Sequence, residues 1–207
     1  VQNLSTPFFD DRMLHGGINI INSNIEISNL NIKDSASEDA INIISSNSII
    51  NNLSILNAFS DGVDIDFGKI KFNEIYCSDI KNDCFDVSGS KVEGTYLEAN
   101  NVSDKGISFG ENSMGHIDFV NLKKNRLAIA VKDGSELSIN ESELEENEFD
   151  VSVFKKKMEF GNAKLTMHKS NKSKDLNILI GLNNDFIFNK YKKINKVDNE
   201  YIYNLFY

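Results

Sequence analysis

The chain has 207 residues, 40% of them hydrophobic, with no Trp and a single Pro. Its formal charge is −9, from 22 basic and 31 acidic side chains. This balance argues against a general nucleic-acid binder, because such proteins depend on neutralising phosphates. No run approaches the roughly 18 apolar residues that a membrane span needs, so we expect no membrane-spanning helix.

A short strand-like motif recurs along the chain at a fixed interval. Gly62, Cys84, Gly106 and Ala128 are its anchor positions, each 22 residues after the last. The same interval continues to Asp150 and back to Ala40, and a 23-residue step then reaches Gly17. A period of this length is typical of a solenoid.

The residues one and three positions after each anchor are apolar in every copy. Such alternation predicts a strand with one face buried. These pairs are Ile18/Ile20, Ile41/Ile43, Val63/Ile65, Phe85/Val87, Ile107/Phe109, Ile129/Val131 and Val151/Val153. A second apolar set follows in each copy, and it shifts by one residue in the fifth and sixth copies, which indicates a turn one residue longer. The sequence therefore predicts an all-β fold, a right-handed, single-stranded parallel β-helix of about seven turns with about three short strands per turn, roughly 34 Å long.

The period fades after about residue 170, so we expect β-helix repeats over 1–170 and a C-terminal capping segment over 171–207. The segments 185–194 and 200–207 are predicted as two aromatic strands around a polar bend at 195–199, and they would cover the lower end of the coil. An aromatic platform for sugar stacking is the alternative interpretation. Since little precedes the first turn, the chain is expected to be the C-terminal portion of a longer protein; its oligomeric state is open.

Acidic side chains occupy an outward-facing column of the predicted coil. Asp64 and Asp86 should lie on adjacent turns about 4.8 Å apart, with Asp66 beside Asp64 on the same face. Like charges at this spacing repel each other unless a cation, a proton or water intervenes. Asp64, Asp66 and Asp86 are therefore candidate calcium ligands, the alternative being a solvated acidic strip without a ligand.

A second polar column precedes each anchor. Asp39, Asp61 and Asp83 are expected to cap bends by bonding to their own backbone. Lys105 replaces aspartate in the next turn, where it should lie close to Asp86. We consider Asp86, Lys105 and Lys132 as candidate catalytic residues: Lys105 as a base beside a uronate, and Lys132 as a carboxylate-binding group. An ordinary ion pair is the alternative for Lys105.

Cys77 and Cys84 are too few for a disulfide framework. Cys77 falls on a core column, where a free thiol packs as a small hydrophobic group. A disulfide between the two residues remains open from the sequence.

The motifs EDAINII, SDGVDIDF, NDCFDVSGS and DKGISFGENS resemble the right-handed parallel β-helix repeats of the pectate-lyase-like superfamily. The similarity covers residues 14–170, and it is closest to C-terminal β-helix regions of bacterial proteins that sometimes carry a CotH-like domain. This resemblance implies activity on, or binding to, acidic polysaccharides, often with calcium. It favours an extracellular or cell-envelope location over the cytoplasm.

Two functions follow as hypotheses. The first is a rigid, non-catalytic module that binds a polysaccharide or a partner protein within a larger bacterial protein. The second is a polysaccharide lyase, epimerase or hydrolase that acts on an acidic glycan at the Asp/Lys face; the pair needed for glycoside hydrolysis would come from Asp64, Asp66 and Asp86. A trimeric stalk is a third possibility, although no heptads support it.

Overall fold

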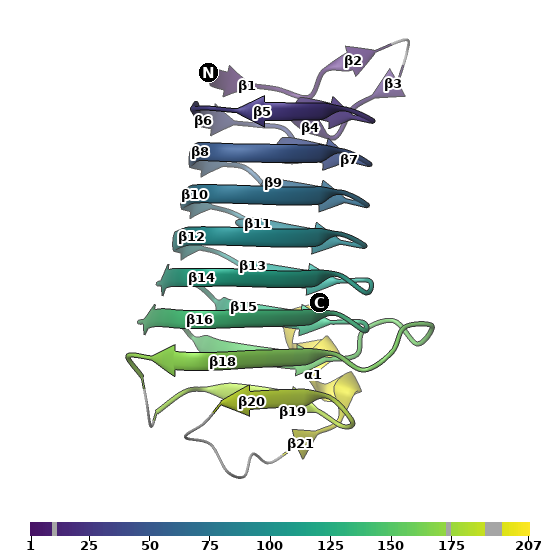
Figure 1. Cartoon of the computed structure of the whole chain (residues 1–207), viewed down its shortest axis with the longest axis vertical. Coiled ribbons are helices and arrows are strands. Elements are labelled where there is room, and N and C mark those ends of the chain that lie inside the picture. Colours follow the sequence, from purple (N-terminus) through teal and green to yellow (C-terminus); the bar gives the residue numbers. More distant parts are fainter. Residues whose placement is uncertain (10–11, 173–174, 189–195) are drawn as a thin grey trace.

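The computed structural model describes residues 1–9, 12–172, 175–188 and 196–207, and it is a parallel β-solenoid (Figure 1). Its larger sheet, here the front sheet, contains ten strands. In spatial order they are β1 (Gln2–Leu4), β6 (Leu30–Ser35), β8 (Asn47–Ala58), β10 (Lys69–Ile80), β12 (Lys91–Val102), β14 (Met114–Lys123), β16 (Glu136–Glu145), β18 (Lys164–Ser170) and β20 (Asp185–Phe188), with β5 (Asn24–Ile27) also paired to β8.

A second, nine-stranded sheet, here the back sheet, lies behind the front sheet. Its strands are β4 (Gly16–Ile21), β7 (Asp39–Ile44), β9 (Asp61–Asp66), β11 (Phe85–Ser88), β13 (Lys105–Gly110), β15 (Leu127–Lys132), β17 (Phe149–Phe154), β19 (Ile178–Gly181) and β21 (Lys196–Val197). Near the N-terminus, β2 (Phe8–Phe9) and β3 (Arg12–Met13) form an antiparallel hairpin. All pairing within the two large sheets is parallel, as a coil of successive turns requires.

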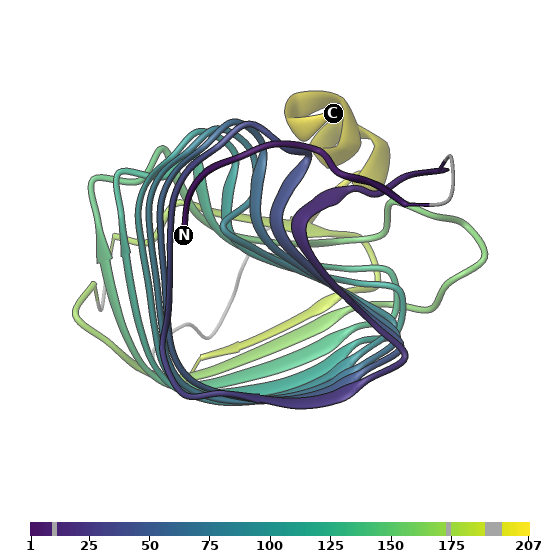
Figure 2. The same cartoon turned by 90° about the horizontal axis from the view of Figure 1, so that it is seen from above.

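Each turn contributes one strand to the back sheet and a longer, bent segment to the front sheet. In the first turn this segment is divided into β5 and β6, which both pair with β8. In later turns the two pieces are continuous, and Figure 2 shows the chain bending around a common axis. The predicted three short strands per turn are thus separate only in the first turn, and in later turns two of them are joined into one longer strand.

The core consists of residues in single file along the axis. Ile18, Ile41, Val63, Phe85, Ile107, Ile129, Val151 and Ile178 are successive register partners in the back sheet. From Ile41 to Val151 their side chains are fully buried. The 22-residue period thus stacks apolar side chains directly over each other, which is how a repeat that cannot bury its own apolar face gains a core.

The turn between β13 and β14 is longer than its counterpart between β11 and β12, as the shifted apolar set predicted. Val92 therefore pairs with Gly115, 23 residues later, and not with the residue 22 positions on. Serine hydroxyls hold these corners together, because Ser113 Oγ accepts from Ser90 N at 3.1 Å and Ser135 Oγ accepts from Ser113 N at 3.1 Å. The backbone N–H groups at the bends are therefore satisfied inside the coil.

The coil continues beyond residue 170 to about eight turns, because β19 pairs with β17 and β20 pairs with β18. The prediction of a strand over residues 200–207 is wrong. Asn199–Phe206 forms helix α1, whose N-cap Asp198 accepts a hydrogen bond from the Glu200 N–H at 2.9 Å. Part of the other predicted aromatic strand, residues 189–194, lies outside the described residues.

Helix α1 packs against the outside of the back sheet, and not across the lower end of the coil as predicted (Figure 2). Ile202 and Phe206 are buried against Leu127, Ala130 and Phe154. These outward positions of β15 and β17 are apolar, whereas the same columns are polar in the turns above. No helix in the described part of the chain is long and apolar enough to cross a membrane.

Cys77 and Cys84 form a disulfide, which the sequence had left open, with their Cα atoms 5.9 Å apart. The bond joins the end of β10 to the bend before β11. Both residues are buried in the core cluster. Of the two alternatives that the sequence left open, the disulfide is the one present, because the bend brings Cys84 back beside Cys77.

Candidate functional site

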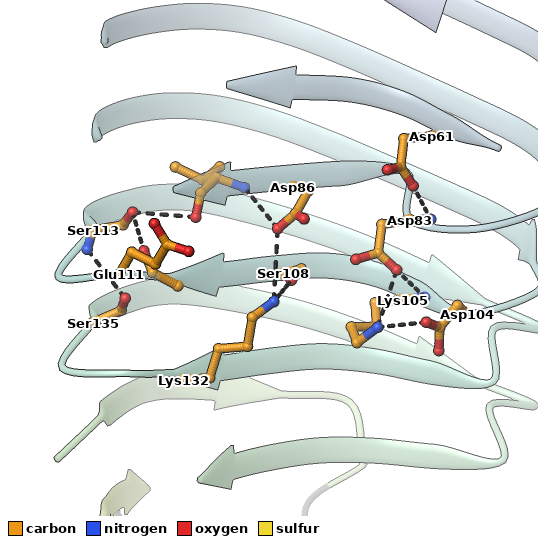
Figure 3. A network of polar contacts seen from close by, with 12 residues as sticks. Asp61, Asp83, Asp86, Asp104, Lys105, Ser108, Glu111, Ser113, Lys132 and Ser135 are labelled. Atoms are coloured by element: carbon orange, nitrogen blue, oxygen red, sulfur yellow. Dashed lines mark hydrogen bonds and ion pairs between the residues drawn. The ribbon is translucent and has the colours of Figure 1, made fainter. Parts of the chain in front are cut away.

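The outward surface of the back sheet carries the acidic strip that the sequence predicted, of which Figure 3 shows Asp86. Asp64 in β9 and Asp86 in β11 are direct register partners, and Asn42 and Ser108 continue their column on either side. Asp66 lies on the same strand as Asp64 and is paired with Ser88. The 22-residue period therefore brings Asp64 and Asp86 together as expected.

The Lys132 side chain reaches from β15 across β13 to this strip. Its Nζ donates to Ser108 Oγ at 2.5 Å and lies 3.8 Å from Asp86 Oδ1. The lysine side chain runs over Gly110, where an added Cβ would approach Lys132 Cε to 3.0 Å. The missing side chain at Gly110 thus lets Lys132 fold back along the sheet and neutralise Asp86.

Lys105 forms ordinary ion pairs, as the alternative interpretation predicted, but not with Asp86. Its Nζ lies 2.5 Å from Asp104 Oδ2 and 3.3 Å from Asp83 Oδ1, and no contact with Asp86 is seen in the described residues (Figure 3). Lys105 is 2% exposed, so its ammonium group is almost completely removed from water. Of the two lysines, Lys132 is the partner of Asp86, because Lys105 points along the column of Asp83.

The aspartates of the second column bond to the neighbouring turn, and not to their own backbone as predicted. Asp61 Oδ1 accepts from the Asp83 N–H at 2.7 Å, and Asp83 Oδ1 accepts from the Lys105 N–H at 3.1 Å. Asp39 accepts instead from the side chain of Asn42 at 2.7 Å. Asp61 and Asp83 therefore accept from backbone N–H groups of the next turn, and the expectation that they bond to their own backbone is wrong.

The two lysines remain protonated in this environment. Burial lowers the pKa of Lys105, but Asp83, Tyr207 and Asp104 outweigh burial and raise it above its usual value. For Lys132 the same opposition, with Asp86 as the largest favourable charge, also raises the pKa. A raised pKa opposes the role of a general base, which must give up its proton near neutral pH.

Several carboxyl groups of the strip and of the neighbouring second column hold protons more tightly than usual. Burial, followed by the charges of Asp66 and Asp86, raises the pKa of Asp64 to about 9. Burial and the neighbouring Asp83 raise the pKa of Asp61 to about 8. Burial also raises the pKa of Asp83, to about 6, against the opposing charge of Lys105. The strip is consequently less negative at neutral pH than its composition indicates.

The calcium ion expected at Asp64, Asp66 and Asp86 is not tested by the geometry alone. In the described part of the chain, no group of three or more His, Cys, Asp or Glu side chains is arranged to hold a metal ion. The calcium site therefore stays a prediction from the sequence.

Helix α1 bounds the lower edge of the strip. The Lys105 Nζ lies 4.7 Å from the centre of the Tyr207 ring, and the Lys156 Nζ lies 3.6 Å from it. Arg126 Nη2 also donates to the Leu205 carbonyl at 2.7 Å. The lysines expected to face a substrate are thus partly covered by Tyr207.

A second site, which the sequence interpretation missed, lies on the outside of the front sheet. It is a groove of about 940 Å³ that crosses five successive turns, from β5 to β14. Its lining repeats in register in three columns: Asn24, Asn47, Lys69, Lys91 and Met114; Ile25, Ser48, Ile70, Val92 and Gly115; and Glu26, Ile49, Lys71, Glu93 and His116. Four steps of the sheet make the groove about 19 Å long.

Lysines give the groove a local positive charge in an otherwise acidic body. Lys69 and Lys91 are exposed register partners on adjacent strands, and neither has an ion-pair partner among the described residues. Lys71, by contrast, pairs with Glu93 at 2.7 Å. Stacked like charges are unfavourable in a sheet, so an anion between Lys69 and Lys91 would relieve their repulsion. The interval of 22 residues between them was readable in the sequence.

Comparisons with protein-family models, with curated proteins and with solved structures found no match for this chain. The arrangement of the described residues therefore carries the functional argument.

Proposed function

We propose that this chain is a rigid β-solenoid module that binds an extended acidic polysaccharide. The observation that carries the proposal is the unneutralised lysine pair, Lys69 and Lys91, in a groove that crosses five turns. A groove of this length suits a linear chain, since each turn presents the same backbone floor and a new pair of side chains. Binding of a partner protein in the groove is the alternative.

Two further features support a binding role over a catalytic one. The ammonium groups of Lys105 and Lys132 form ion pairs with carboxylates of the same sheet. Tyr207 lies over Lys105.

The disulfide between Cys77 and Cys84 suits an oxidising location outside the cytoplasm, where such bonds persist. A protein in such a location would meet the acidic glycans of a cell surface. Membership of the pectate-lyase-like superfamily, as part of a larger bacterial protein, belongs to the same proposal.

The test is a calorimetric titration with polygalacturonate, a linear uronate polymer, with neutral dextran as the comparison. We expect binding of the uronate polymer alone, with affinity falling as salt is added. The double variant Lys69→Gln/Lys91→Gln should bind at least about tenfold more weakly, if each lysine contributes about 0.7 kcal/mol.

The matched control is Lys33→Gln/Lys81→Gln, which removes the same charge at exposed lysines outside the groove. Its affinity should stay close to that of the unmodified protein. Equal losses in the two double variants would mean that the attraction is not localised in the groove, and absence of any binding by the unmodified chain would remove the proposal.

Hydrolysis of an acidic glycan at the Asp/Lys face is a second candidate, and one observation favours it. Asp64 retains a proton at neutral pH and is stacked on Asp86, whose carboxylate faces the Lys132 ammonium. A proton-bearing carboxyl beside a second carboxyl is the arrangement that glycoside hydrolysis needs. Release of reducing ends from polygalacturonate that is abolished in Asp64→Asn, but retained in Asp61→Asn, would support this candidate over simple binding.

A further inference from the structure

Two tyrosines and two glutamates form a square on the outside of the front sheet, beyond the bend that separates it from the groove. Glu74 and Tyr76 come from β10, and Tyr96 and Glu98 come from β12. Glu74 is the register partner of Tyr96, and Tyr76 is the register partner of Glu98. Tyrosines therefore occupy one diagonal of this tyrosine–glutamate square, and carboxylates occupy the other.

Hydrogen bonds along each strand fix the carboxylates of the square. Tyr76 Oη donates to Glu74 Oε2 at 3.0 Å, and Tyr96 Oη donates to Glu98 Oε2 at 2.7 Å. Asn121 Nδ2 in the next turn also donates to Glu98 Oε2, at 3.3 Å. The carboxylates are thus oriented before any partner arrives, which reduces the entropy lost on binding.

The square carries negative charge without a cation. Neither Glu74 nor Glu98 has an ion-pair partner among the described residues, and all four side chains of the square are half-buried. Lower on the same sheet, by contrast, Lys123 pairs with Glu145 and Lys169 pairs with Glu141. The carboxylates of the square are therefore available to a positive group from outside.

One face of the Tyr76 ring has no aromatic neighbour in the described part of the chain. Tyr96 lies between Phe119, stacked at 5.6 Å, and Tyr76, at 5.4 Å. Tyr76 contacts no ring other than Tyr96 in the described part of the chain, and its register partner on the opposite side is Ser54, which is too small to cover a ring. The Tyr76 ring thus has Tyr96 on one side and the small Ser54 on the other, with the Glu74 carboxylate beside it.

We propose that the tyrosine–glutamate square is a docking surface for a partner protein, and that it receives an arginine side chain from an extended basic segment. The guanidinium would stack on the free face of Tyr76 and donate to the Glu74 carboxylate. Arginine suits an aromatic ring beside a carboxylate better than lysine does, because its planar, weakly hydrated head both stacks on aromatic rings and forms paired hydrogen bonds to carboxylates. Tyrosine and arginine are also the residues most enriched where interfaces bind tightly.

The experiment uses a short fluorescein-labelled peptide of alternating Gly and Arg, with a Gly and Lys peptide of the same length, and follows fluorescence anisotropy at low salt. We expect the Arg peptide to bind more tightly than the Lys peptide. Tyr76→Leu, which keeps an apolar side chain but removes the ring, should weaken Arg-peptide binding by about two- to fivefold. Glu74→Gln should weaken it to a similar extent, and circular dichroism checks that both variants are folded.

Glu143→Gln is the matched control, because Glu143 is exposed on the same face and in the same column as Glu98 but has no tyrosine beside it. The control should leave the affinity nearly unchanged. Equal effects of Glu74→Gln and Glu143→Gln, or equal affinity for the two peptides, would show that net charge alone attracts the peptide and would overturn the proposal. Loss in Tyr76→Leu and Glu74→Gln, but not in the control, would support it.

Discussion

Replacing Asp64 with Asn should make the protein less sensitive to alkaline pH. Burial and the nearby Asp66 and Asp86 raise the pKa of Asp64 from 3.8 to about 9. The folded state therefore holds a proton that the unfolded chain releases above its ordinary pKa. The linked stability is complete below about pH 4, falls between about pH 4 and pH 9, and is lost at higher pH. Asn cannot ionise, so the variant should lack this decline.

The size of the effect follows from the number of protons that separate the two states. One proton corresponds to a slope of about 1.4 kcal/mol per pH unit, and therefore to an upper limit of about 4 kcal/mol between pH 5 and pH 8. Asp64 keeps some contact with water, and Asp66 can share the proton. We therefore expect about half of this limit, roughly 2 kcal/mol, as the gain of Asp64→Asn over the unmodified protein across this range.

Guanidinium unfolding followed by circular dichroism at each pH from 5 to 8 measures the effect. The control is Glu136→Gln, which removes an exposed carboxyl from the front sheet that has no ion-pair partner among the described residues. The free energies of unfolding of the unmodified protein and the control should fall together as pH rises, while that of Asp64→Asn should fall less. Parallel curves for all three proteins would refute the assignment of a retained proton to Asp64.

Three other changes have outcomes that follow from the same contacts. Lys132→Met should lower the unfolding free energy in denaturant titrations by about 2–3 kcal/mol. This is less than the 3–5 kcal/mol for a fully buried pair, because Asp86 retains some exposure. An unchanged unfolding midpoint would show that the pair is solvated. Replacing both Cys77 and Cys84 with Ala should cost about 2–3 kcal/mol by loop-closure entropy, and calorimetry should show a lower melting temperature; equal melting temperatures would contradict the expected stabilisation. Phe206→Ala should release α1, because Phe206 anchors it against Phe149, and limited proteolysis should then cleave within the helix; unchanged resistance would mean that other contacts hold it.

Sequence periodicity predicted the parts of this fold that each turn repeats. Val63, Phe85, Ile107 and Ile129 lie in one file because every copy places an apolar residue at the same position. The stacking of Asp86 on Asp64 followed from the same interval. The handedness of the coil stays a prediction.

Features that do not repeat were harder to predict. The aromatic residues between Tyr201 and Phe206 suggest a strand. Yet Ile202 and Phe206 are spaced four apart, as on one face of a helix, and Asp198 provides an N-cap. Whether Lys105 or Lys132 meets Asp86 depended on side-chain direction, which Gly110 decides by leaving room over the strand. The lysine pair of the groove could have been found by applying the same interval to the outward positions of the front sheet.

The bend within the long strands has a consequence for how the molecule could work. It separates the columns of Lys69 and Lys71 from those of Glu74 and Tyr76 by only a few residues of the same strand. The groove and the tyrosine–glutamate square thus lie side by side on the same front sheet, and they differ in charge. A sugar chain in the groove and a protein segment on the square would therefore be held side by side without a flexible linker. The winding of the backbone would set the distance between them.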